Sequence, residues 1–135
     1  MSRVAILLSI HPHFADQIFD GTKRIEFRKR NVPAEIDRVF VYSTSPISTI
    51  LGYFDVETTL ELSPATLWRK YSSIGGISKE AFDSYYQGHR LGRGLLIRSI
   101  RRYSRTLPLP KRMRAPQSFT YLADEMVTQM TRRGG

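Results

Sequence analysis

The sequence contains no cysteine among its 135 residues, and it contains only three histidines. The lack of cysteine excludes disulfide bonds, thiolate metal sites and thiol catalysis. His11, His13 and His89 alone form no convincing metal site, so we expect no metal and no cofactor. The longest apolar run, residues 4–8, is far too short to cross a bilayer, and no secretory signal pattern opens the chain. We therefore expect a cytoplasmic protein that does not associate with membranes.

Basic charge is abundant and unevenly distributed. The formal net charge is +9. Residues 1–86 contain ten Lys/Arg and ten Asp/Glu, whereas residues 87–135 contain eleven Lys/Arg against Asp124 and Glu125 only. A basic half joined to a balanced half is typical of proteins that bind a phosphate backbone. The alternative is an ordinary solvated surface with a basic tail.

Residues 21–28, GTKRIEFR, place an amine, a carboxylate and guanidinium groups directly after a turn glycine. In a strand, side chains alternate between two faces, so we expect Ile25 and Phe27 to be buried. The opposite, polar face would then carry Arg24, Glu26, Arg28 and Arg30. Lys23 is one residue out of phase and reaches that face only from the turn at Gly21 or through a bulge. If they converge, these groups form a charged site; otherwise they form an ion-pair ladder on an edge strand.

The order of apolar segments, glycines and prolines predicts a mostly β (α+β) chain with short inserted helices. Strands are predicted over residues 3–10, 23–29, 39–42, 50–61 and 94–103. Helices are predicted from Pro12 to a cap at Gly21, from Ser63 to the break at Gly75 and Gly76, over residues 78–86, and over residues 121–133. Prolines preclude regular structure from residue 108 to 117. About five strands of this kind predict a half-closed barrel; the alternative is an open sheet with its helices on one side.

The octapeptide fits the G-x-K-x-x-E-x-R pattern of the ASCH family, and the chain resembles that family beyond this motif. The blocks LLSIHPHFADQIFDGTKRIEFRKR, VFVYSTSPISTILGYFDV, LWRKYSSIGGISKEAFDSYYQG and PQSFTYL follow each other in the family's order, over roughly residues 6–122. The resemblance implies a PUA-like pseudo-β-barrel of about five to six strands over residues 1–122, followed by a basic tail over residues 123–135. It also implies RNA binding, and some members resemble amidohydrolases of acylated nucleosides or ribonucleases.

Members that resemble N4-acetylcytidine amidohydrolases use a lysine of this motif, a threonine three residues later and a glutamate before the later helix. Lys23 matches the lysine, but Glu26 stands at the threonine position. Residues 73–78, SIGGIS, offer no carboxylate. Lys23 and Glu26 are therefore the candidate catalytic residues of an arrangement in which two of the three family roles are unfilled.

Other residues are candidates for contacts with a nucleotide or RNA because they combine hydroxyl, amide, aromatic or cationic groups with segments at the ends of strands. They are Ser9, His11, Tyr42, Ser43, Thr44, Ser45, Arg101, Arg102, Tyr103, Gln117 and Ser118. Each also has an ordinary structural interpretation: the serines and threonine can satisfy their own turn, His11 can be a surface residue, and Gln117 can belong to a turn anchored by aromatic residues.

We expect an RNA-binding or nucleotide-binding domain. Its pocket would hold a modified or unmodified nucleotide between Lys23, Glu26, Arg28 and the turn at residues 43–45. Residues 90–114 would bind the phosphate backbone. Two alternatives stay open. One is a hydrolase that acts on acylated nucleosides, or a ribonuclease; the other is a regulatory module that binds a small anionic metabolite in the same pocket.

Overall fold

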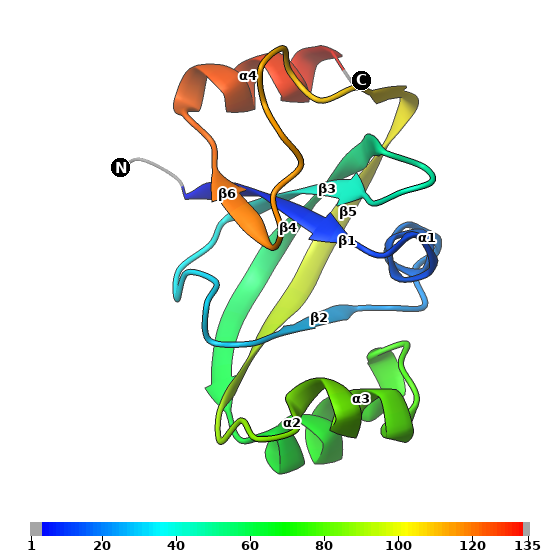
Figure 1. Ribbon diagram of the computed structural model, residues 1–135, viewed down its shortest axis with the longest axis vertical. Helices are drawn as coiled ribbons and strands as arrows, with labels where there is room; N and C mark the ends of the chain where they lie inside the picture. The colour runs from blue at the N-terminus through cyan, green and yellow to red at the C-terminus, as the bar shows by residue number, and fades with distance from the viewer. Residues whose placement is uncertain (1–3, 134–135) are drawn as a thin grey trace.

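The computed structural model describes residues 4–133, and a six-stranded sheet, curled into a half-barrel, organises the chain (Figure 1). The strands are β1 (Ala5–Ile10), β2 (Ile25–Arg28), β3 (Arg38–Ser43), β4 (Thr49–Leu62), β5 (Gly92–Leu107) and β6 (Phe119–Tyr121). Their order across the sheet is β2-β5-β4-β3-β1-β6. The pair β1–β3 is parallel, and the other neighbours are antiparallel. The prediction of a mostly β, half-closed barrel is confirmed.

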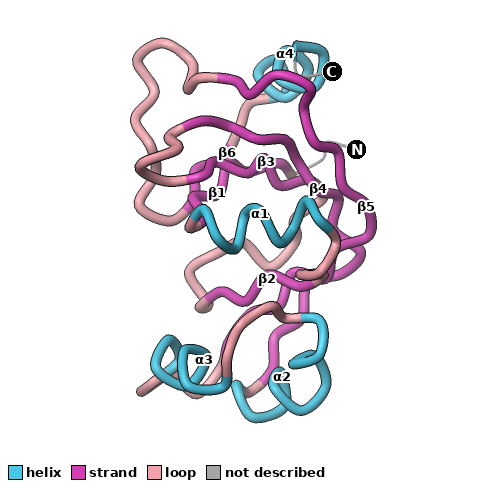
Figure 2. The backbone as a smooth tube through the Cα atoms, turned by 90° about the vertical axis from the view of Figure 1, so that its right-hand side faces the viewer, coloured by secondary structure: helices cyan, strands magenta, loops and turns pink. Residues whose placement is uncertain are grey.

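Four short helices cover this sheet: α1 (Pro12–Asp20), α2 (Pro64–Tyr71), α3 (Lys79–Tyr86) and α4 (Asp124–Arg133). Local sequence explains their limits. Pro12 occupies the first turn of α1, and Gly21 ends that helix with a left-handed φ of 88°. Ser63 and Ser78 accept backbone hydrogen bonds at the starts of α2 and α3. Figure 2 shows α1 across the middle of the molecule, α2 and α3 together at one end, and α4 at the other.

Three apolar clusters hold these layers together. Strand β1 is buried on both faces: Ile6 and Leu8 pack with α1 in the first cluster, whereas Leu7 packs with α4 in the second. A third cluster packs α2 and α3 against β2, and its members include Phe27 and Phe82. A cleft between the first and third clusters is therefore bounded by α1, β2 and α3, the elements around the GTKRIEFR segment.

Two elements differ from the sequence prediction. Strand β5 runs to Leu107, beyond the predicted end at residue 103, because it pairs along the whole of the long strand β4. Strand β6 was not predicted; its three residues carry no periodic pattern, and pairing with β1 makes them a strand. The predicted start of the first strand at residue 3 lies outside the described residues. So do the first residues of the predicted domain over residues 1–122 and the last two residues of the predicted tail over residues 123–135. Within residues 4–133, no helix has the length and apolar character needed to cross a membrane.

Candidate functional site

A cavity of about 500 Å³ opens between α1, β2 and α3, and we call it the Lys23 pocket. Its walls are mostly apolar and aromatic, with three charged side chains among them. The lining residues are Ile10, His11, Phe14, Lys23, Glu26, Phe27, Arg28, Ile77, Ala81, Ser84 and Tyr85. A mainly apolar cavity with a few convergent polar groups is the usual form of a ligand site.

Lys23 reaches this pocket from the turn that Gly21 opens, which is one of the two routes that the sequence allowed. Its backbone N–H donates to the carbonyl of Gln17, and its side chain is only 3% exposed. The Nζ atom donates to the carbonyl of Gly75 at 2.6 Å and lies 3.6 Å from Oε1 of Glu26. It also lies 5.1 Å from the ring centroid of Phe14, within cation–π range. The amine is thus fixed between a carbonyl, a carboxylate and an aromatic wall.

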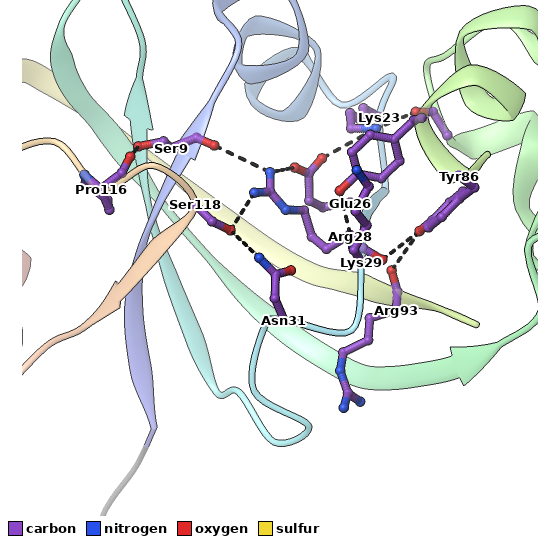
Figure 3. A network of polar contacts seen from close by, with 12 residues as sticks. Ser9, Lys23, Glu26, Arg28, Lys29, Asn31, Tyr86, Arg93, Pro116 and Ser118 are labelled. Atoms are coloured by element: carbon purple, nitrogen blue, oxygen red, sulfur yellow. Dashed lines mark hydrogen bonds and ion pairs between the residues drawn. The ribbon is translucent and has the colours of Figure 1, made fainter. Parts of the chain in front are cut away.

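Glu26 and Arg28 complete the charged group (Figure 3). Oε2 of Glu26 accepts from Nη1 of Arg28 at 3.3 Å, and Nη2 of Arg28 donates to Oγ of Ser118 at 2.9 Å. Nη1 also donates to the carbonyl of Ser9 at 3.4 Å. Arg28 therefore connects β2 with β1 and with the segment before β6. The polar face predicted for β2 is buried at its centre, where the Glu26 side chain is 6% exposed, whereas Arg24 and Arg30 at its two ends are exposed.

Burial makes Lys23 an unusual amine. Desolvation lowers the pKa of Lys23 from its ordinary 10.5, and the nearby charge of Arg28 lowers it further. The carboxylate of Glu26 opposes both effects. When all three side chains are ionised, the group carries one net positive charge. Such a group can donate hydrogen bonds to an anionic or carbonyl oxygen, and its lysine releases a proton more readily than an exposed lysine does.

The turn at Gly75 and Gly76 contributes to the site, although the sequence indicated only a helix break there. A Cβ at Gly75 would lie 2.6 Å from Cε2 of Phe27, so only glycine lets this backbone approach the ring. Gly76 has a φ of 62°, and a Cβ there would lie 3.2 Å from Cβ of Lys23. The missing side chains therefore allow the Gly75 carbonyl to reach the lysine amine.

Gly75→Ala is expected to lower the free energy of unfolding by about 1–3 kcal/mol, because the added methyl group overlaps the Phe27 ring. Urea denaturation measures this change. Gly75 has an ordinary φ of −87°, so no left-handed backbone cost adds to the overlap with the ring. A Gly75→Ala protein as stable as the wild type would contradict the close approach.

The α3 side of the pocket was also missed by the sequence prediction. Ala81 and Tyr85 are four residues apart and share one face of α3, which is the pattern that could have revealed it. Tyr85 is held in place because its Oη accepts from the Lys29 N–H at 3.2 Å, and the Lys29 amine lies 4.7 Å from its ring. Tyr86 fixes α3 to β2 by donating to the carbonyl of Arg28 at 2.7 Å. Burial raises the pKa of both phenols.

Of the other predicted residues, His11 lines the pocket. Ser9 and Ser118 do not line it but accept hydrogen bonds from Arg28. His11 is exposed and caps α1 by accepting from the His13 N–H at 3.3 Å. Oγ of Ser9 donates to the carbonyl of Pro116 at 2.6 Å, which joins β1 to the segment that carries Ser118. Gln117 is exposed and does not line the pocket.

The turn at Ser43, Thr44 and Ser45 does not line the pocket, contrary to the prediction. Ser43 is fully buried opposite Ile10 as the last residue of β3, and the Thr44 N–H donates to the Ile10 carbonyl, which joins the start of the turn to the end of β1. Ser45 is exposed in the connection to β4.

Tyr42 and Tyr103 belong to the second apolar cluster, where they are 6% and 5% exposed. Tyr103, a candidate for contact with a nucleotide, therefore presents little of its ring at the surface. Its neighbours Arg101 and Arg102 are exposed but lie outside the pocket.

The curled sheet and its charged pocket define a PUA-like β domain, and comparison with known proteins gives the family. The ASCH domain profile matches residues 8–105, so this chain belongs to the ASCH domain family. It is 31% identical over 131 residues to an ASCH domain-containing ribonuclease of Zymomonas mobilis. The match covers 91% of this chain and 87% of the relative. The crystal structure of ASCH from Zymomonas mobilis superposes with a TM-score of 0.91 at 25% identity, covering 99% of this chain and 98% of that one.

A third relative is longer. The chain is 32% identical over 120 residues to the large ribosomal subunit protein uL22 of Ureaplasma parvum. That match covers 87% of this chain but only 39% of the relative. The similarity thus extends over one domain-sized part of a longer protein.

Proposed function

We propose that this protein binds single-stranded RNA and holds one nucleotide in the Lys23 pocket. The observation that carries the proposal is the buried Lys23–Glu26–Arg28 group in a cavity of about 500 Å³ with aromatic walls. A ribonuclease among the relatives supports RNA as the ligand. So does the excess of positive charge in residues 87–135.

The lining residues suit a nucleobase. Phe14 and Tyr85 provide rings on which a base can stack, and stacking contributes about 1–3 kcal/mol per base. Lys23 and Arg28 can donate to base carbonyl or phosphate oxygens, whereas Glu26 accepts from an exocyclic amino group. Recognition in this form needs an unstacked base, which favours single-stranded over double-stranded RNA.

A salt titration of RNA binding tests the proposal. The association constant of a single-stranded oligonucleotide should fall with salt on a log–log plot, with a slope of about −0.7 for each neutralised phosphate. A duplex of the same sequence should bind more weakly at every salt concentration. Lack of binding at low salt would overturn the proposal. Tight binding of a free nucleotide with a flat salt response would instead support the metabolite-binding alternative.

RNA cleavage is the second candidate, and the lowered pKa of Lys23 favours it together with the ribonuclease relative. A neutral Lys23 amine can take the proton of a ribose 2′-hydroxyl. The 2′-oxygen then attacks the adjacent phosphorus, the bond to the 5′-oxygen breaks, and that oxygen takes a proton from water. The products are a 2′,3′-cyclic phosphate and a 5′-hydroxyl. RNA with 2′-O-methyl groups should bind but resist cleavage, which separates this activity from binding alone.

Hydrolysis of N4-acylated cytidine has less support. Glu26 occupies the threonine position of the similar amidohydrolases, and the residue 73–78 segment presents the Gly75 carbonyl to Lys23 rather than a carboxylate. A carbonyl cannot accept and return a proton in the way that a carboxylate does.

A further inference from the structure

A second hollow, of about 150 Å³, lies beside β5 and shares Lys23 with the Lys23 pocket. Among its lining residues are Gly21, Arg24, Arg98 and Ile100. The hollow is bounded by the end of α1, the turn after it and the middle of β5. Lys23 is thus the residue at which the two cavities meet.

A β-bulge brings two arginines to this hollow. Along the β4–β5 pair, Asp55 is opposite Ser99 and Val56 is opposite Ile97, which leaves Arg98 without a partner on β4. A bulged residue leaves the regular pleat, so its side chain is re-aimed. The Ile97 N–H donates to the Arg24 carbonyl at 3.0 Å, which places Arg24 beside Arg98 although 74 positions separate them in the sequence.

Arg102 continues this row of cations along β5. Its guanidinium carbon lies 6.0 Å from the ring centroid of Phe19 on α1. Between Arg98 and Arg102 lies Ile100, a large apolar residue that is 42% exposed. Strand β2 pairs only with the part of β5 from Arg93 to Leu96, so the edge of β5 beyond that point is not covered by β2. The row therefore lies on an accessible strand edge.

These guanidinium groups are available for a ligand. Within residues 4–133, neither Arg24 nor Arg98 forms an ion pair with a carboxylate, unlike Arg28, Arg38 and Arg93. The acidic residue that lies near them is Glu57, which lines an adjoining hollow with both arginines. Charged side chains on a free strand edge also prevent edge-to-edge aggregation, and this protective role is the alternative explanation of the row.

We infer that Arg24, Arg98 and Arg102 bind successive phosphates of the RNA strand that continues from the nucleotide in the Lys23 pocket. The inference rests on the proposed function, because the pocket defines where that strand begins. Three cations in a row that form no ion pair within residues 4–133 match a polyanion better than they match a single small ligand. Arg98 and Arg102 belong to the segment 90–114 that the sequence predicted to bind the phosphate backbone, and the row adds Arg24 from the turn before β2.

The Arg24→Gln/Arg98→Gln double variant tests the inference against a charge-matched control, Arg69→Gln/Arg132→Gln. Arg69 on α2 and Arg132 on α4 are exposed and lie on other elements. Binding of a single-stranded oligonucleotide is measured by fluorescence anisotropy over a range of salt concentrations, and binding of a nucleoside monophosphate is measured beside it. We expect the salt slope of the arginine-row variant to become shallower by about 1.4, the loss of two phosphate contacts, with monophosphate binding unchanged.

An equal decrease of the salt slope in the arginine-row variant and in the control would overturn the inference, because it would show that binding responds to net charge alone. An unchanged slope in the row variant would overturn it too and would leave edge protection as the explanation. If the wild-type protein binds the oligonucleotide but no monophosphate, the proposed pocket function fails. In that case the salt slopes of the arginine-row variant and its control still show whether Arg24 and Arg98 contact phosphates of the oligonucleotide.

Discussion

Glu26→Ala is expected to lower the free energy of unfolding by about 3–5 kcal/mol, as measured by urea or thermal denaturation. The carboxylate is the common partner of Lys23 and Arg28, whose side chains are 3% and 15% exposed. Its removal leaves two cations close together in a site from which most water is excluded. Uncompensated buried charge is costly because the protein interior screens it poorly. Release of the Lys23 proton limits the loss at high pH, so the effect should be larger at neutral pH than at high pH.

Asp83→Ala is the matched control for that substitution. Asp83 pairs with Lys79 at 2.6 Å, a shorter distance than the 3.6 Å between Lys23 and Glu26. However, both side chains of this pair are more than half exposed. We expect a loss of about 0.3–0.5 kcal/mol, the usual value for an exposed i, i+4 pair. A Glu26→Ala loss as small as the Asp83→Ala loss would show that water reaches the charged group freely.

Local chemistry limited the possible arrangements of the part of the site that comes from one segment. Strand alternation and the turn at Gly21 left two alternatives, a shared charged site or an ion-pair ladder, and the structure places the charged atoms of Lys23 and Glu26 3.6 Å apart in one pocket. Serine caps predicted the starts of α2 and α3 in the same way. These features depend on neighbours within a few positions, which a sequence displays directly.

The rest of the site depends on contacts between segments that are distant in the sequence. Nothing near Gly75 indicates that its carbonyl meets an amine 52 positions earlier. Tyr103 lies among arginines in the sequence, yet a register shift between β4 and β5 and packing beside Tyr53 bury its ring. The bulge at Arg98 likewise arises from strand pairing and not from a local motif. Tertiary packing decides each of these positions.

The proposed ligand binding gives a reason for the buried charged group that stability alone does not supply. Well-packed apolar residues of similar volume often stabilise a protein as much as a buried ion pair does. The pocket keeps Lys23 desolvated and short of partners that would fully compensate its charge, which lowers its pKa. Functional sites commonly retain such groups at a cost in stability. Replacement of Lys23 should therefore weaken function while preserving the fold.

Lys23→Met is expected to weaken RNA binding by about tenfold to 100-fold, because it removes a charge-assisted hydrogen bond of about 1.5–3 kcal/mol. If the protein cleaves RNA with Lys23 as the base, cleavage should fall further, by about 10²-fold to 10⁴-fold. Methionine keeps the unbranched apolar stem, so the packing against Phe14 and Phe27 is preserved. Binding and cleavage of the same oligonucleotide are compared with those of Lys79→Met, which removes an exposed lysine on α3.

The same variant has a signature in the pH dependence of stability. Because burial lowers the pKa of Lys23 in the folded protein, the unfolded chain binds this proton more tightly. The contribution of Lys23 to the free energy of unfolding therefore rises with pH, up to the unfolded pKa of 10.5. The difference in the free energy of unfolding between wild type and Lys23→Met should thus increase between neutral pH and that value. A flat difference for Lys23→Met, together with unchanged RNA binding, would show that the amine is solvated and remove the physical basis of the proposed site.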